Sequence, residues 1–130
     1  MLDKVEYWLG LCDDDIEAAR VMLQAKKFLW TGFICHLITE KALKAVVASV
    51  TEAVPPKTHD LPKLAHIAGI SGDLSPRQKS LLNKLVPLQI EARYPEHKEK
   101  IAKSLTKNYC IGLLEETEEF LCWIKNRLGK

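Results

Sequence analysis

The feature that most restricts the fold is a helical segment, residues 31–50, that is apolar on two opposite sides. At about 100° per residue, its apolar residues fall into two arcs, Ile34, Leu37, Ile38, Ala45 and Ala48 against Leu43, Val46, Val47 and Val50. A helix with two apolar sides is buried on both of them. One side can face a bundle core, and the other needs either a second helix layer of the same chain or a second subunit. The pattern predicts a central helix and leaves both alternatives open.

The rest of the chain also has helical periodicity, interrupted by turn signals. Apolar residues recur at spacings of three and four from Asp3 to about Lys27, which predicts an amphipathic helix. Pro55 and Pro56 end the central helix in a loop, and a short helix is expected from Leu61 to about Ala68. Because Asp60 precedes this short helix, it can cap the helix start.

Two further helices are expected in the second half of the chain. Ser75-Pro76 is a strong helix start, and Pro87 predicts a kink in the helix that follows. After Pro95 a last long helix should run to Leu128. Alternating apolar runs are missing, so strands are not expected. The sequence predicts one all-α domain over residues 1–130, an up-and-down bundle of four long helices plus one short helix, forming a homodimer.

Composition excludes several classes of protein. No apolar run approaches the roughly 18 residues of a membrane span, and the first residues do not resemble a secretory signal, so a cytoplasmic protein is expected. The net charge of +2 is too small to indicate DNA or a membrane as partner. Four cysteines (Cys12, Cys35, Cys110 and Cys122) form no CxxC pair and are interpreted as reduced, mostly buried thiols. Neither a metal site nor a cofactor is expected.

The central helix carries the first candidate binding residues. His36, Glu40 and Lys44 are spaced by four residues, and Glu40 followed by Lys44 is a favourable pair on a helix. Lys41 projects into an apolar arc, where a free ammonium should not be buried. Its stem can extend to the surface, which we take as the first hypothesis, or it can meet a carboxylate or an anionic ligand.

His59 is a further candidate, because it lies where a loop leads into the short helix. Unpaired N–H groups at a helix start favour anions, so His59 could bind a phosphate there. The alternative is a local turn or packing role, which is more frequent for such a histidine.

The stretch EARYPEH, residues 91–97, combines Arg93, Tyr94 and His97 around Pro95. Each residue has a structural explanation, since Pro95 favours a helix boundary and Arg93 complements the end of the preceding helix. The functional hypothesis is that Arg93 holds a phosphate while His97 moves a proton, the minimum for metal-independent RNA cleavage.

Several short motifs, in this order and spacing, resemble the HEPN domain family (higher eukaryotes and prokaryotes nucleotide-binding). They are Trp8, the stretch DIEAA at 15–19, EKALKA at 40–45, HDL at 59–61, ARYP at 92–95 and Trp123-Ile124. Together they cover nearly the whole chain. They are most similar to the small stand-alone prokaryotic branch of the family, which is similar to the C-terminal domain of the chaperone sacsin.

The resemblance implies a helical homodimer that binds a nucleotide, or that pairs with a minimal nucleotidyltransferase in a toxin–antitoxin-like system. Some members of the family are ribonucleases, whose motif is an arginine, four to six residues, and a histidine. Arg93 and His97 are separated by three residues and a proline lies between them, so we expect no catalysis of that kind. The candidate ligand-binding residues are Lys41, Lys44, His59, Arg93 and Tyr94. The alternatives are an RNA-cleaving toxin that uses Arg93 and His97, and a helical dimerisation adaptor without a ligand.

Overall fold

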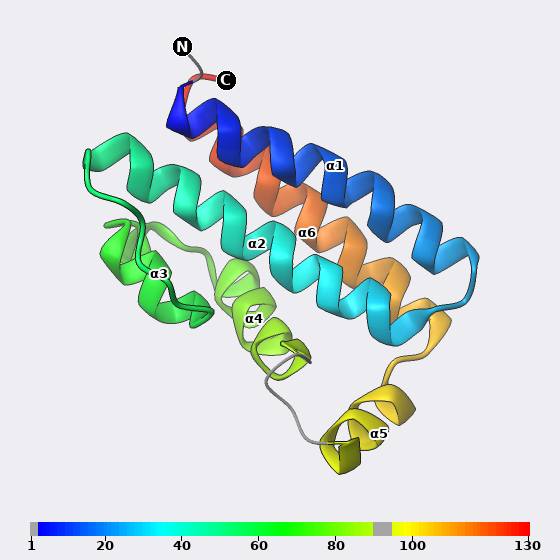
Figure 1. Ribbon diagram of the computed structural model, residues 1–130. Coiled ribbons are helices and arrows are strands. Elements are labelled where there is room, and N and C mark those ends of the chain that lie inside the picture. Colours follow the sequence, from blue (N-terminus) through cyan, green and yellow to red (C-terminus); the bar gives the residue numbers. More distant parts are fainter. Residues whose placement is uncertain (1–2, 90–94) are drawn as a thin grey trace.

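The computed structural model describes residues 3–89 and 95–130, and every regular element in that part of the chain is helical (Figure 1). The elements are α1 (Lys4–Gln24), α2 (Phe28–Val50), α3 (Leu61–Ile67), a 3₁₀ turn η1 (Ser71–Asp73), α4 (Pro76–Leu85), a 3₁₀ turn η2 (Val86–Leu88), α5 (Pro95–Ser104) and α6 (Lys107–Arg127). The prediction of an all-helical bundle is confirmed for the described residues.

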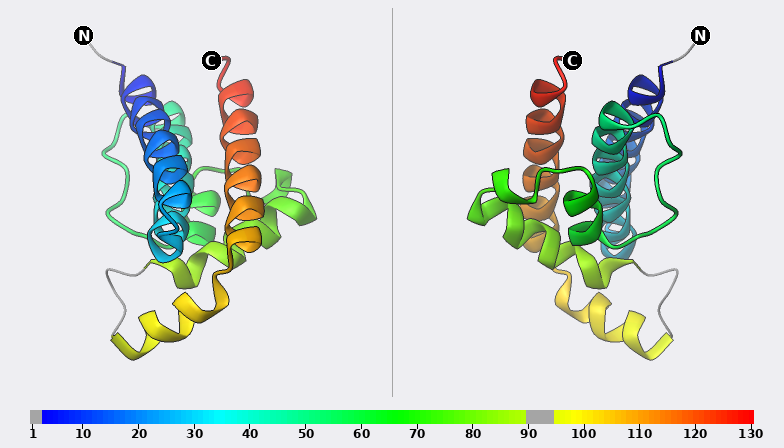
Figure 2. Two further views of the ribbon diagram at one scale, coloured as in Figure 1. Left: turned by 90° about the vertical axis from the view of Figure 1, so that its right-hand side faces the viewer. Right: turned by 90° about the vertical axis from the view of Figure 1, so that its left-hand side faces the viewer.

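Three long helices form the centre of the bundle. In Figure 1, α1 and α2 are antiparallel neighbours, and α6 lies alongside both and runs in the same direction as α2. The turn between α1 and α2 is tight, with Lys26 at a positive φ of 61°. Figure 2 shows α3 and α4 on the far side of α2 from α1, while α5 extends from one end of the bundle. Helix α2 therefore occupies the middle of the molecule.

Other helices of this chain cover most of the two apolar arcs of α2, although Ile34, Leu37 and Ala48 of the first arc are only half-buried. Ile38 and Ala45 of the first arc are fully buried, and so is Leu43 of the second; Val46 and Val47 are buried almost completely. Helix α2 is thus enclosed by other helices of this chain along most of its length, and Val50, at 62% exposed, is the most exposed member of the two arcs.

The prediction of one long helix at the end of the chain is wrong. The chain breaks at Leu105 and Thr106, so that α5 and α6 are separate helices. Leu105 is buried, and a Cβ built on Gly32 of α2 would come within 3.4 Å of its side chain. Thr106 then caps α6, because its side chain accepts a hydrogen bond from the Tyr109 backbone N–H. Anchoring of Leu105 against α2 and capping by Thr106 together replace the continuous helix.

Other predicted helix ends agree with the structure. Asp60 caps α3, and Ser75 caps α4 in a reciprocal arrangement with Gln78.

The prediction of a kink at Pro87 is wrong. Helix α4 ends at Leu85, and Pro87 lies in the 3₁₀ turn that follows.

Over the described ranges, no helix is both long and apolar enough to span a membrane.

Candidate functional site

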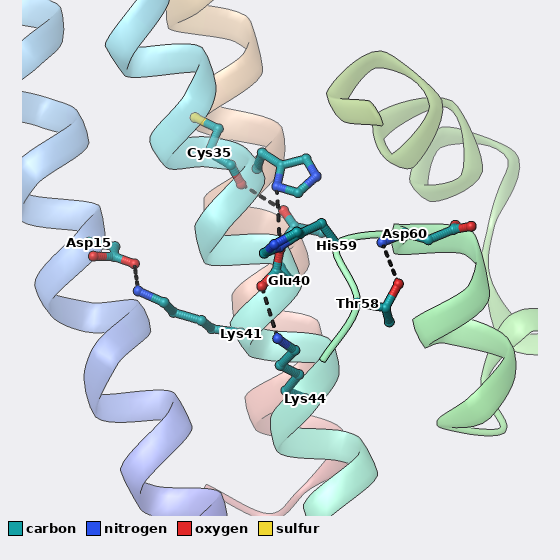
Figure 3. A network of polar contacts seen from close by, with 10 residues as sticks. Asp15, Cys35, Glu40, Lys41, Lys44, Thr58, His59 and Asp60 are labelled. Atoms are coloured by element: carbon teal, nitrogen blue, oxygen red, sulfur yellow. Dashed lines mark hydrogen bonds and ion pairs between the residues drawn. The ribbon is translucent and has the colours of Figure 1, made fainter. Parts of the chain in front are cut away.

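The centre of the candidate site is Glu40, a carboxylate in the middle of α2 whose side chain is only 5% exposed. A buried carboxylate is costly unless charged or hydrogen-bonding partners surround it. Glu40 has such partners: Lys44 Nζ lies 3.0 Å from its Oε2, and His59 Nδ1 lies 2.7 Å from its Oε1 (Figure 3). Each carboxylate oxygen therefore meets a different nitrogen-bearing side chain.

Lys44 is held on two sides. It follows Glu40 by one helical turn, and its ammonium also lies 5.6 Å from the centre of the Trp8 ring on α1. A cation over an indole face is attracted by the negative charge of the ring face. The Glu40–Lys44 pair that the spacing predicts is confirmed. Its burial is not visible in the sequence, because the covering groups come from other helices.

His36 is the fourth member of this group, one turn before Glu40 on the same helix. Its ring is completely buried, and Nδ1 lies 3.7 Å from Glu40 Oε1. The spacing of four residues thus places one basic side chain, His36, on one side of the Glu40 carboxylate and another, Lys44, on the other side.

His59 reaches this carboxylate from a different element. It lies in the loop before α3, and its side chain is 55% exposed although Nδ1 faces the buried Glu40. The loop is fixed locally, since Thr58 Oγ1 accepts the Asp60 N–H at 3.2 Å and Asp60 Oδ1 accepts the Lys63 N–H at 3.1 Å. The first turn of α3 is thus capped by Asp60, while the His59 ring contacts Glu40 of α2.

Lys41 belongs to a separate contact. Its Nζ donates to Asp15 Oδ2 at 2.7 Å and joins α2 to α1, with both side chains 22% exposed. Of the alternatives for Lys41, the structure shows the carboxylate partner, and the first hypothesis of a lysine extending freely to the surface is wrong. An anionic ligand would have to compete with Asp15 for this ammonium.

The remaining candidates from the sequence are not brought to this cluster. Arg93 and Tyr94 lie outside the described residues. His97 is exposed near the start of α5, the helix that extends from one end of the bundle (Figure 2). Of the candidate ligand-binding residues in the described ranges, Lys44 and His59 share one carboxylate and Lys41 is paired elsewhere.

The family model for the HEPN domain matches residues 5–127, nearly the whole chain. The chain belongs to the HEPN domain family. This confirms the resemblance drawn from the sequence motifs. No curated protein and no solved structure matches the chain.

In this HEPN domain, the EKALKA motif (residues 40–45) supplies two of its three charged residues, Glu40 and Lys44, to the buried cluster, and the HDL motif (residues 59–61) supplies His59. Trp8, the early tryptophan of the family pattern, covers Lys44. Motifs from three different elements therefore meet at one place in the fold. Sequence reasoning missed Glu40 as the centre, although a carboxylate with basic residues four positions before and after it was a usable signal.

The cysteines of the HEPN domain are not part of this site. Burial raises the pKa of the Cys12 and Cys35 thiols to about 12, and it also raises the pKa of Cys110. Such thiols stay protonated near neutral pH and are poor nucleophiles. Three of the four cysteines are buried, as the sequence predicts, and Cys122 is exposed.

Proposed function

We propose that this HEPN domain is a non-catalytic module that binds the phosphate groups of a nucleotide at the exposed edge of His59. The observation that carries the proposal is the half-exposed ring of His59, anchored through Nδ1 to the buried Glu40 carboxylate. Anchoring fixes the ring before a ligand arrives, which lowers the entropic cost of binding. The family itself, named for nucleotide binding, supports the choice of ligand class.

Two lysines add positive charge around His59. Lys57 and Lys63 are both exposed, and within the described ranges neither makes an ion pair. A histidine and two free ammonium groups within seven residues are suited to a polyphosphate. Lys44 would act indirectly, by neutralising Glu40, rather than by touching the ligand.

Calorimetric titration with ATP and other nucleotides tests this proposal. We expect measurable binding that weakens at least severalfold in His59→Ala and in Lys57→Ala/Lys63→Ala. His66→Ala is the matched control, because His66 is an exposed histidine on α3 itself. The absence of heat with every nucleotide, or equal losses in His59→Ala and His66→Ala, would contradict the proposal.

The partner half of the proposal is a toxin–antitoxin-like pair of this domain with a minimal nucleotidyltransferase. Family membership supports it. A nucleotidyltransferase encoded next to this chain, followed by co-purification of the two proteins, would support it further; failure of the two proteins to co-purify would count against it.

Homodimerisation is also proposed, and the half-buried Ile34, Leu37 and Ala48 of the first arc of α2 leave apolar surface that a second copy could cover. Light scattering coupled to size exclusion measures the mass directly. A mass equal to the single chain of 14.7 kDa at micromolar concentration would contradict this part of the proposal.

A further inference from the structure

We propose that His59 is a nucleophilic histidine whose Nε2 accepts a phosphoryl group from a small high-energy phosphoryl donor, such as a phosphoramidate. The inference does not rest on nucleotide binding. It depends on the orientation of one ring relative to one carboxylate, and on the contrast with the other histidines of the chain.

The first step concerns the tautomer of His59. Its Nδ1 lies 2.7 Å from Glu40 Oε1, and an ionised carboxylate can only accept a hydrogen bond. In the neutral ring, the single N–H must therefore be on Nδ1, which leaves Nε2 with a lone pair. A carboxylate that fixes a histidine tautomer in this way also stabilises the imidazolium that forms when the ring reacts.

The second step concerns access to Nε2. Glu40 is 5% exposed and lies at Nδ1, whereas the His59 side chain as a whole is 55% exposed. Because Glu40 occupies the Nδ1 side of a ring that is half in solvent, we take the Nε2 edge as the part of the ring that a small donor can approach. Figure 3 shows His59 meeting Glu40 from the loop side, with Thr58 and Asp60 turned away from the carboxylate.

The third step compares His59 with the other three histidines. His36 is fully buried, so it is not accessible to a donor. His66 and His97 are exposed, but across residues 3–89 and 95–130 neither ring makes a hydrogen bond or an ion pair with a carboxylate. Among the described residues, His59 is thus an exposed histidine oriented by a carboxylate, whereas His66 and His97 are exposed without such a contact.

The proposed reaction is a simple displacement at phosphorus. The Nε2 lone pair of His59 attacks the phosphorus of phosphoramidate in its N-protonated form (⁺H₃N–P), the P–N bond breaks, and ammonia leaves with the electron pair of that bond. An Nε2–P bond forms, and the ring, still protonated on Nδ1, carries a positive charge against the Glu40 carboxylate. Neither an oxidant nor a metal is needed for this step.

The test is phosphorylation of the whole protein with phosphoramidate near neutral pH, without nucleotide. The rate at each histidine is measured by mass spectrometry of peptides and by phosphorus NMR. We expect His59 to react severalfold faster than His66 and His97, and His36 not to react. In urea the preference for His59 should disappear. Equal rates at His59, His66 and His97 in the folded protein would overturn the proposal.

Variants then test the role of Glu40. In Glu40→Gln the rate at His59 should fall to that of His66, while in His66→Asn it should stay unchanged. Glu40→Gln removes a buried charge, so its fold is checked by circular dichroism; Glu40→Met/Lys44→Met, which leaves neither charge of the pair uncompensated, serves as the second variant and should also make His59 slow. A fast His59 in either folded variant would contradict the assignment to Glu40. Failure of nucleotide binding in calorimetry would leave this result unaffected, which separates the two proposals.

Discussion

At the scale of single residues, the stability of the molecule depends on how the charge of one buried carboxylate is compensated. Glu40 lies in the interior of a helix that is otherwise mostly apolar, and it is tolerated there because Lys44 and His59 contact its two oxygens. Taking away one partner of a buried ion pair leaves a charge without compensation, and that costs more than the pair itself contributes.

Glu40→Ala should therefore lower the free energy of unfolding by about 3 kcal/mol, because it leaves the Lys44 ammonium in an 11% exposed position without its carboxylate. The double variant Glu40→Met/Lys44→Met should be more stable than Glu40→Ala, since no charge remains to be compensated. Urea titrations of the two variants measure the difference. If the double variant is the less stable of the two, the cost lies in packing rather than in the unpaired charge.

The buried thiols give a prediction at alkaline pH. Cys12 and Cys35 have a pKa of about 12 in the folded chain and about 9 when unfolded. Between these values the unfolded state binds fewer protons, so the free energy of unfolding falls as pH rises from 9, by up to about 1.4 kcal/mol per pH unit for each thiol.

Thermal or urea unfolding at pH 8 and pH 10 measures this loss of stability. The variant Cys12→Ala should be less stable at pH 8 but should lose less on going to pH 10. Cys122→Ala is the control, because Cys122 is exposed. A loss in Cys12→Ala as steep as that of the parent would show that the Cys12 thiol does not titrate in this way.

The contact partner of a charged side chain could be predicted from the sequence only where the two residues lie close together in the chain. The Glu40–Lys44 pair follows from a spacing of four on one helix, and it is present. The contacts of Glu40 with His59 and of Lys41 with Asp15 join residues 19 and 26 positions apart. No local pattern encodes such contacts, which explains why the partner of Lys41 stayed open between a carboxylate and a ligand.

At the scale of elements, helix ends were predicted well where a cap and a proline act together. Ser75-Pro76 starts α4 as expected. The break between α5 and α6 was missed because its signal, Leu105 followed by Thr106, contains neither proline nor glycine. An apolar residue that continues the helical pattern looks the same in sequence whether the helix runs on or stops to bury it.

Thr106→Ala tests the break directly. The Thr106 side chain accepts the Tyr109 N–H at 3.2 Å, so its loss should cost about 1 kcal/mol of unfolding free energy. Ser104→Ala is the matched control, since Ser104 Oγ donates to the Ile101 carbonyl inside α5 and caps no helix. Equal effects of the two substitutions in urea titrations would argue against the cap.

At the scale of the whole molecule, ion pairs join the first and last helices. Arg20 contacts Glu118 at 2.9 Å, and Lys125 contacts Asp13 at 2.6 Å. These contacts are largely exposed, and each contributes at most about 1 kcal/mol. They favour one position of α6 along α1 and contribute little to the packing of the core.

Exchanging the charges of one pair tests this role. Asp13→Lys and Lys125→Asp should each destabilise the fold by roughly 0.5 kcal/mol, and the double exchange should recover most of the loss. Asp14→Lys is the control, because within the described residues the exposed Asp14 makes no ion pair. Additive losses in the double variant, measured by urea titration at low salt, would exclude a direct interaction.

The start of α1 and the end of α6 lie at the same end of the bundle, where Lys130 Nζ is 3.3 Å from Glu6 Oε1 (Figure 1). A domain whose two ends meet in this way can be placed inside a surface loop of another polypeptide with short joints and without stretching the host. Because the two ends are close, they can also be linked in a circular permutant whose new termini lie in the loop between α2 and α3. The geometry of this bundle thus suits insertion as a domain into a loop of a larger protein.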